Sequence, residues 1–125
     1  MCKNVLIVED SLYTRTLIKN TLESGGFEVI GQASTGEEAI DLARRLQPDV
    51  ITLDNILPDM WGTDVLKIYS EEGLSSKVIM VSAVGQELIV NECMQLGAFA
   101  YIVKPFTPEE LLGVLNKIHF ADQKG

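Results

Sequence analysis

Apolar residues gather in five short clusters along the chain, and amphipathic stretches with a helical period separate them. The clusters at 5–8, 50–53 and 78–81 are uninterrupted and rich in β-branched residues, as is typical of strands that are covered on both faces. The clusters at 27–33 and 100–103 are more mixed or shorter, so we expect them to form edge strands.

A helical stretch follows each cluster. We predict the first, third and fourth helices over 11–24, 62–72 and 86–96. The pair Gly25–Gly26 ends the first of these and Gly97 ends the last, because glycine readily adopts the left-handed conformation that closes a helix.

Capping residues mark the beginning of the second and fifth helices. Thr35 with Glu38, and Thr107 with Glu110, have the spacing of a capping box, and Pro108 suits the first helical position. The apolar stripes predicted to face the sheet are Ala39, Ala43 and Leu46 in the second helix and Leu111, Leu115 and Ile118 in the fifth.

Five alternations of strand and helix predict an α/β fold in one domain over residues 1–125, with a parallel sheet covered on both faces. Right-handed crossovers make a flavodoxin-like, doubly wound (βα)5 sheet of order 2-1-3-4-5 a common solution. In such a sheet ligands bind outside the carboxyl ends of strands 1 and 3, where the winding direction reverses.

Composition narrows the class of protein. At 125 residues with 46% hydrophobic and 22% charged positions, the chain can bury one core. No apolar run approaches the length of a membrane helix and the N-terminus does not resemble a signal peptide, so we expect a cytoplasmic protein without membrane contact. A net charge of −8 argues against non-specific nucleic-acid binding.

Three residues of catalytic type have simpler explanations. Cys2 and Cys93 lack metal-ligand spacing, so we interpret them as reduced thiols. His119 lies near the end of the last helical pattern, where contact with the helix dipole or solvent exposure is expected rather than catalysis.

Carboxylates converge where the predicted winding reverses. Strand 1 ends in Glu9 and Asp10, strand 3 ends in Asp54, and neighbouring strands lie about 4.8 Å apart. Two such charges about 5 Å apart repel by roughly 3 kcal/mol at an effective dielectric near 20. A hard divalent cation would compensate, and oxygen ligands in an open, wet site favour Mg²⁺.

Each acid considered alone has a structural alternative. Asp10 or Ser11 could cap the first helix, and Asp54 could brace its own loop. The other strand ends favour function, because Ser82 ends strand 4 and Lys104 follows strand 5. A site for phosphoryl transfer needs a carboxylate that accepts the phosphoryl group, a cation that bridges it, and two hydrogen-bond donors for its oxygens. The strand ends supply residues of all these types.

The motifs "VLIVED", "TLDNILPDMWG", "VSA" and "YIVKPF", in this order and spacing, resemble the receiver domain of bacterial two-component response regulators. The resemblance covers essentially the whole chain. Members of that family are themselves known examples of the strand order 2-1-3-4-5, so the resemblance corroborates the order, which is not an independent prediction.

The resemblance implies roles for individual residues. Asp54 would accept a phosphoryl group from a histidine kinase, and Glu9 and Asp10 would hold Mg²⁺ together with Asp54 and the backbone carbonyl of Ile56. The remaining positions that match are Ser82 as the switch hydroxyl that moves to the phosphate, Lys104 as the lysine that pairs with the phosphate, Pro105 after a cis peptide bond, and Tyr101 as the switch aromatic.

Several positions depart from the family pattern or have open roles. Glu9 stands where many members have Asp, and Asn55 follows the acceptor where apolar residues are frequent. Trp61 fits surface packing, and for Tyr101 packing of an edge-strand aromatic on a helix stays an alternative. Ile56 and Val84 flank the approach to the phosphate in the family; both are apolar here, so we expect them to lengthen the lifetime of the acyl phosphate.

The resemblance therefore implies a stand-alone CheY-like receiver, a phosphoacceptor that assists its own phosphorylation and dephosphorylation and is not otherwise an enzyme. The partners implied are a CheA-like histidine kinase, the flagellar motor switch or another protein target, and a phosphatase, with the receiver a monomer. The alternatives are a phosphorelay intermediate, a small aspartyl phosphohydrolase and a flavodoxin-like cofactor domain. The phosphohydrolase is disfavoured because Ile56 stands where such hydrolases have a second Asp. The cofactor domain is disfavoured because the sequence lacks a G-x-G-x-x-G motif.

Overall fold

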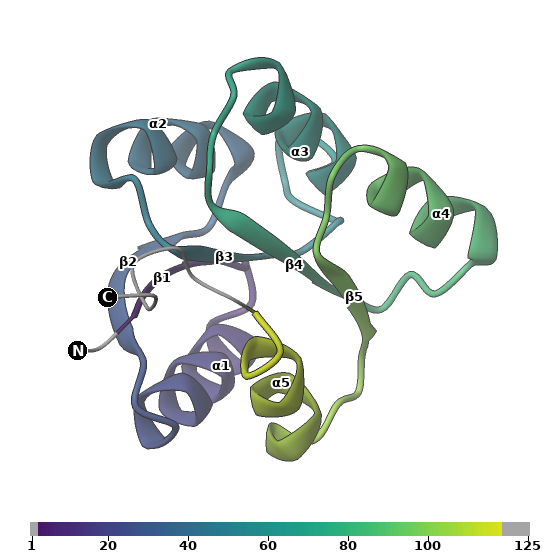
Figure 1. The fold of residues 1–125 in the computed structure, drawn as a ribbon. Helices are drawn as coiled ribbons and strands as arrows, with labels where there is room; N and C mark the ends of the chain where they lie inside the picture. Colours follow the sequence, from purple (N-terminus) through teal and green to yellow (C-terminus); the bar gives the residue numbers. More distant parts are fainter. Residues whose placement is uncertain (1–2, 119–125) are drawn as a thin grey trace.

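The structure, a computed structural model, describes residues 3–118, so Cys2 and His119 lie outside the described residues. Five strands alternate with five helices along this part of the chain (Figure 1). The strands are β1 (Asn4–Val8), β2 (Glu28–Ala33), β3 (Val50–Leu53), β4 (Lys77–Ser82) and β5 (Ala100–Val103). The helices are α1 (Leu12–Ser24), α2 (Gly36–Leu46), α3 (Gly62–Glu71), α4 (Glu87–Gln95) and α5 (Pro108–Leu115).

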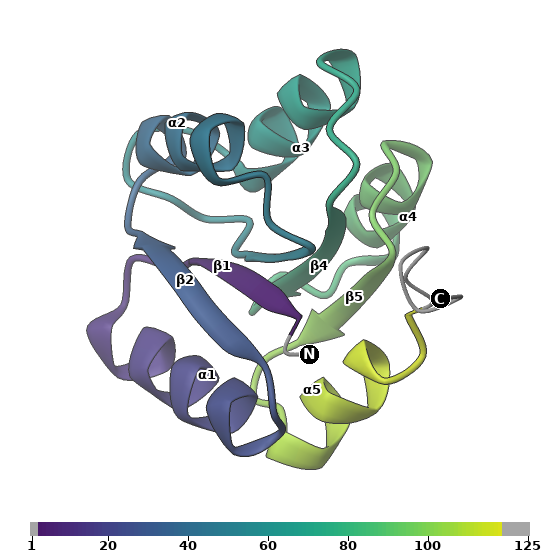
Figure 2. The same ribbon diagram turned by 60° about the vertical axis from the view of Figure 1, so that its left-hand side comes forward.

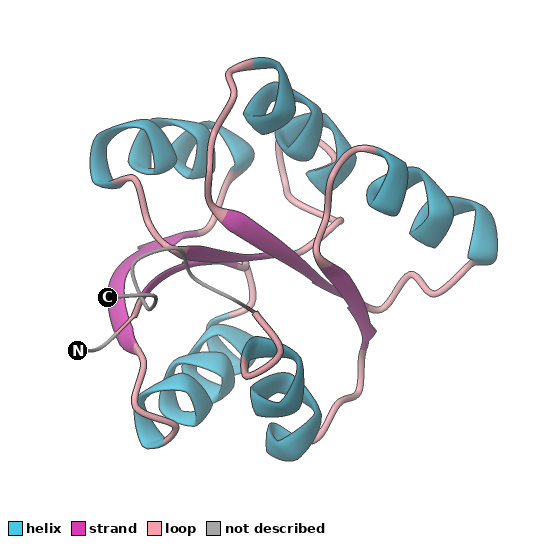
Figure 3. Cartoon of the chain, viewed as in Figure 1, coloured by secondary structure: helices cyan, strands magenta, loops and turns pink. Residues whose placement is uncertain are grey.

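The strands form one parallel sheet of order β2-β1-β3-β4-β5, which confirms the predicted topology. Helices α1 and α5 cover one face, and α2, α3 and α4 cover the other (Figure 1, Figure 3). Figure 2 shows the edge strand β2 between α1 on one face and α2 on the other. None of the helices in the described part of the chain is both long and apolar enough to cross a membrane.

Alternate residues of the central strands enter two separate cores. Leu6 and Val8 of β1 pack in the cluster beneath α2, α3 and α4, whereas Val5 and Ile7 pack in the cluster beneath α1 and α5. Because both faces are covered, every residue of β3 is buried, which explains why the run is nearly all apolar. Strands β2 and β5 keep exposed positions, as predicted for edges.

The second helix departs from its predicted capping box. The hydroxyl of Thr35 accepts a hydrogen bond from the amide of Glu38 at 3.1 Å, as expected. The carboxylate of Glu38, however, accepts from the amide and the hydroxyl of Ser34, one residue earlier than predicted. Ala39 and Ala43 are buried, but Leu46 is 36% exposed, because it lies at the last turn of α2 and packs over Gly31 of the edge strand β2.

The fifth helix has its predicted beginning and an earlier end. Both halves of the capping box between Thr107 and Glu110 form, and Pro108 opens the helix. Leu111 and Leu115 are buried in it. Ile118 is buried too, but it packs from the turn after the helix, where its amide bonds the carbonyl of Leu115.

Candidate functional site

The carboxyl ends of β1 and β3 bring the predicted carboxylates together. Backbone hydrogen bonds extend the sheet to Glu9, whose amide bonds Ala33, and to Asp54, whose amide bonds Val8. One oxygen from each of Glu9, Asp10 and Asp54 lies within 4.8 Å of the others. Glu9 and Asp54 are buried at 1% and 6% exposure, and Asp10 is exposed at the rim.

Lys104 reaches this cluster from the end of β5. Its Nζ lies 2.7 Å from Oε1 of Glu9 and 3.2 Å from Oδ2 of Asp54. Its own amide donates to the carbonyl of Ser82 at 2.9 Å, which joins the ends of β4 and β5. The Lys104–Pro105 peptide bond is cis, as the resemblance implies. One ammonium thus pairs with two carboxylates from two different strands.

Burial and ion pairing shift the pKa values of Glu9 and Lys104 in opposite directions. For Glu9 burial is the larger influence and raises the pKa, against the hydrogen bonds from Lys104 and from the amide of Ser11. Burial would lower the pKa of Lys104, but its hydrogen bond to Glu9 and the charge of Asp54 outweigh that effect and raise it. Lys104 is therefore charged at neutral pH and balances part of the buried negative charge.

The cluster fits a hydrated divalent cation. Opposite oxygen ligands of Mg²⁺ lie about 4.2 Å apart, twice its bond length, so the 4.8 Å cluster needs only small side-chain movements or a bridging water. Both oxygens of Glu9 already have partners, since Oε2 accepts from the amide of Ser11 at 3.0 Å. Both oxygens of Asp54 are bonded as well, to the amide of Ile56 and to Nζ of Lys104, so Asp10 is the carboxylate best placed to contact an ion directly.

The capping alternative for these acids is resolved by Ser11. Its hydroxyl accepts from the amide of Thr14 at 3.3 Å and caps α1, so Asp10 is not needed for that role. Arg15, which the sequence reasoning missed, donates to the carbonyl of Glu9 at 2.8 Å. Asp54 does brace its own loop, because Oδ1 accepts from the amide of Ile56 at 3.2 Å. The predicted bracing of the loop is thus confirmed, and it coexists with the place of Asp54 in the carboxylate cluster.

The predicted switch residues Ser82 and Tyr101 both bond the backbone of Val84. Ser82 is fully buried, and its hydroxyl oxygen accepts from the amide of Val84 at 3.2 Å. The hydroxyl of Tyr101 donates to the carbonyl of the same residue. Tyr101 also packs against the core beneath α4, so the packing role and the contact with the β4–α4 loop coexist.

Asn55, whose role the sequence left open, ties the candidate acceptor to α3. It is buried, and its side-chain oxygen accepts from the amide of Thr63 at 3.1 Å while its carbonyl accepts from Gly62 at 2.6 Å. A Cβ on Gly62 would lie 2.7 Å from the Cα of Asn55 and overlap the carbonyl of Asp54. The helix therefore begins directly on the backbone of the acceptor, and only glycine fits.

Apolar side chains border the acceptor on its α4 side. Ile56 and Trp61 pair in an isolated β-bridge and are 48% and 58% exposed. With Val84 they belong to a pocket of about 380 Å³, whose lining residues are Asn55, Ile56, Trp61, Thr63, Val84, Gln86 and Ile89. Ile56 and Val84 thus lie on the same apolar surface next to Asp54, and Trp61 is a surface residue as predicted.

Cys93, the cysteine within residues 3–118, is free and fully buried. Burial raises the pKa of its thiol to about 11, with a smaller contribution from the charge of Glu92. A thiol that is neutral and enclosed is inert, as the sequence suggested.

Comparisons with known proteins agree with this geometry. The family model of the response regulator receiver domain matches residues 5–116. Chemotaxis protein CheY of Thermotoga maritima is 39% identical, covering 94% of this chain and 98% of the relative, and that of Bacillus subtilis is 37% identical with the same coverage. The structure of the CheX-CheY-BeF3-Mg complex from Borrelia burgdorferi superposes with a TM-score of 0.88 at 36% identity, covering 90% of this chain and 86% of that one.

Proposed function

The chain belongs to the response regulator receiver family, and from this premise we propose that it is a CheY-like switch phosphorylated on Asp54. The observation that carries the proposal is the pairing of Lys104 with Asp54 beside two further carboxylates. This arrangement combines a nucleophile, a cation site and a fixed ammonium within one crevice. The relatives' role in chemotaxis supports the same role here.

In the proposed reaction a carboxylate oxygen of Asp54 attacks the phosphorus of the donor. With a phosphohistidine donor the P–N bond breaks and its electron pair stays on the imidazole, which takes up a proton; with acetyl phosphate the leaving group is acetate. The product in both cases is an acyl phosphate on Asp54. Mg²⁺ held by Asp10 and Asp54, with Glu9 and the Ile56 carbonyl, would neutralise charge on the phosphoryl oxygens.

The residues around Asp54 orient the acceptor and then bind the product. Before transfer, the Ile56 amide and Lys104 each hold one carboxylate oxygen. After transfer, we propose that Lys104 pairs with a phosphate oxygen and that the Ser82 hydroxyl leaves the Val84 amide to donate to another. Tyr101, bonded to the Val84 carbonyl, then responds to the shifted loop. The protein is thus a phosphoacceptor that assists its own modification, not an enzyme with a separate substrate.

The proposed output is binding to other proteins. A CheA-like histidine kinase is the donor in this proposal, and the flagellar motor switch is the target. A phosphatase completes the cycle, because Ile56 and Val84 offer no polar atom from their side chains to orient an attacking water. The crystallised complex of a related CheY with CheX supports the proposal that the output is protein binding.

Incubation with acetyl phosphate and Mg²⁺, followed by intact-mass and peptide mass spectrometry, tests the acceptor. The parent should gain one phosphoryl group, and Asp54→Asn should gain none because the amide is not a carboxylate nucleophile. Asp64→Asn, at an exposed acid in the first turn of α3, is the matched control and should behave as the parent. Phosphorylation of the same peptide in Asp54→Asn would refute the assignment.

The lifetime assignment has its own test. After phosphorylation and removal of donor, decay in the double variant Ile56→Asn with Val84→Glu should be faster than in the parent, because polar side chains then flank the phosphate and can orient water. Leu88→Gln, at an apolar residue of α4 that is 83% exposed and does not line the pocket, is the control. Equal decay in the double variant and the parent would remove Ile56 and Val84 from control of the lifetime.

A further inference from the structure

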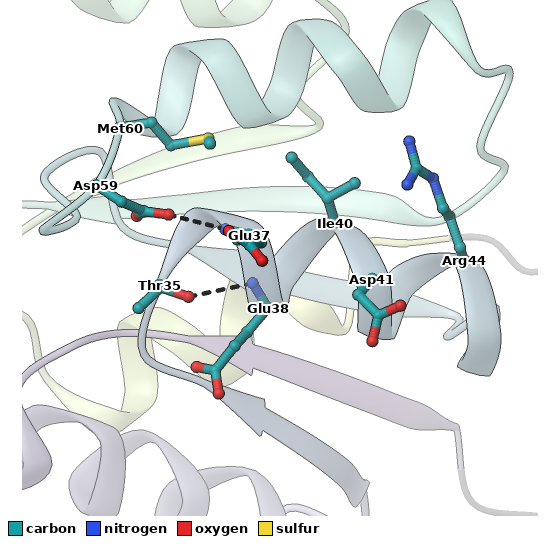
Figure 4. Close-up of a pocket in the computed structure, with 8 residues that line it drawn as sticks. All are labelled: Thr35, Glu37, Glu38, Ile40, Asp41, Arg44, Asp59 and Met60. Atoms are coloured by element: carbon teal, nitrogen blue, oxygen red, sulfur yellow. Dashed lines mark hydrogen bonds between the residues drawn. The ribbon is translucent and has the colours of Figure 1, made fainter.

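Asp59 connects the loop after the acceptor to a distant helix. Its Oδ1 accepts from the amide of Gly36 at 2.7 Å and its Oδ2 accepts from the amide of Glu37 at 3.0 Å. These are the first two residues of α2. Figure 4 shows the carboxylate of Asp59 directed at this turn, while Thr35 caps the next amide, that of Glu38. Side chains thus cap three amides at the beginning of α2, and Asp59 of the β3–α3 loop caps two of them.

The two bonds are charge-assisted. The amide of Gly36 is the larger influence that lowers the pKa of Asp59, and the amide of Glu37 lowers it further. The carboxylate is therefore ionised at neutral pH, where it also interacts favourably with the positive end of the α2 dipole. Nothing in the local sequence predicts this cap, because the partners are 22 and 23 residues away.

Close packing accompanies the bonds. A Cβ on Gly36 would lie 2.5 Å from Sδ of Met60 and overlap its Cγ, so the first residue of α2 touches the residue next to Asp59. Both the hydrogen bonds of Asp59 and the packing of Met60 therefore place the loop in direct contact with α2. Movement of one without the other breaks two hydrogen bonds and opens a gap.

The same loop orients the acceptor. Ile56, three residues before Asp59, donates its amide to Oδ1 of Asp54 at 3.2 Å and pairs across the loop with Trp61. The loop is fixed at its α3 end through Asn55 and Gly62. Asp59 attaches the middle of the β3–α3 loop to the beginning of α2.

We propose that Asp59 is a positioning residue for the phosphoryl site. By capping α2 it fixes the β3–α3 loop, and through the Ile56 amide it sets the orientation of the Asp54 carboxylate. It touches neither donor nor metal. The proposal rests on the function proposed above, and it assigns a part of the geometry of Asp54 to α2, a helix on the face of the sheet opposite α1 and α5 (Figure 1).

Four variants separate positioning from stability and from charge. Asp59→Ala removes both bonds, and Asp59→Asn retains one oxygen acceptor. Thr35→Ala removes a cap of the same helix without touching the loop, and Glu37→Gln removes an exposed charge of the same surface without removing a cap. Urea unfolding first establishes conditions in which every variant is folded.

Three measurements are made under those conditions. They are the amide hydrogen exchange of Ile56, the Mg²⁺ dissociation constant from Trp61 fluorescence, and the rate of Asp54 phosphorylation by acetyl phosphate. We expect Asp59→Ala to accelerate Ile56 exchange, to weaken Mg²⁺ binding about threefold to tenfold and to slow phosphorylation by a similar factor. Asp59→Asn should recover part of each effect, and Thr35→Ala and Glu37→Gln should match the parent.

Two results would overturn the proposal. If Thr35→Ala reproduces the effects of Asp59→Ala at equal loss of stability, the cap serves α2 alone. If Glu37→Gln reproduces them, long-range charge is the cause. A parent that acetyl phosphate does not modify on Asp54 would instead refute the proposed function, and Ile56 exchange would still decide whether Asp59 holds the loop.

Discussion

Replacing Lys104 by methionine tests the electrostatics of the site most directly. The change keeps the length of the stem and removes the ammonium that pairs with Glu9 and Asp54. Two buried carboxylates then face each other without a cation. We expect the folded state to lose stability and the variant to depend on Mg²⁺ far more than the parent, because the ion supplies the missing charge.

The magnitude follows from the burial of the three groups. The side chains of Lys104, Glu9 and Asp54 are 20%, 2% and 8% exposed, so solvent screens the pairs only weakly. Removing one partner of a buried ion pair costs about 3–5 kcal/mol, and the partial exposure of Lys104 favours the lower end. In a domain of this size about 3 kcal/mol corresponds to a fall of roughly 10 °C in the melting temperature.

Urea unfolding and thermal melts with and without Mg²⁺ measure both effects. Lys67→Met, at an exposed lysine of α3, is the matched control and should stay within about 0.5 kcal/mol of the parent. Asp54→Asn placed in the Lys104→Met background should restore part of the stability by removing one of the two repelling charges. A Lys104→Met variant as stable as the parent, with an unchanged response to Mg²⁺, would refute the reasoning.

Four further outcomes are expected. Thr52→Val should raise the free energy of unfolding by about 1 kcal/mol in urea, because the buried hydroxyl of Thr52 has no partner among the described residues. Gly62→Ala should abolish phosphorylation by acetyl phosphate and lower the melting temperature, since a Cβ there overlaps the backbone of Asp54. The lowered pKa of Asp59 means that its bonds stabilise the fold above the unfolded pKa, about 4, and are lost as the pH falls through the folded value; Asp59→Asn should flatten the stability profile in that range. Peptide mass spectrometry should find Cys93 unmodified by iodoacetamide at pH 8 in the folded protein and modified after unfolding, in keeping with a pKa of about 11.

The central strands and the position of the site could be predicted because each depends on a single strong signal. A nearly all-apolar run such as 50–53 forms a strand buried on both faces, and the strand that follows it repeats the pattern. Once the order of the strands was known, Glu9, Asp54 and Lys104 had to meet at one edge of the sheet. Chain topology alone therefore located the chemistry.

The contacts that set the fine geometry could not be predicted in the same way. Capping rules compare residues three apart, whereas Asp59 caps amides 22 and 23 residues away and Asn55 bonds an amide eight residues on. The carboxylate of Glu38 bonds the amide of Ser34, whereas the capping box predicts the amide of Thr35. Which of these neighbouring amides is bonded depends on backbone angles, and the spacing of residue types in the sequence does not determine them. The double pairing of Lys104 likewise depends on how far its stem can extend between two strands.

The two backbone bonds of Val84, from its amide to Ser82 and from Tyr101 to its carbonyl, have a consequence for the sharpness of the proposed signalling. A net hydrogen bond contributes about 1 kcal/mol, and one to a charged group about twice as much. In the proposed switch, exchanging the Ser82–amide bond for a phosphate contact would therefore alter the balance of loop conformations by only about 1–2 kcal/mol, or roughly five- to thirtyfold. With so small a preference, we expect the molecule to visit both loop conformations before and after modification. The proposed output would then follow the modified fraction of the population gradually, and a steep threshold in a downstream response would have to come from the number of copies that the target binds.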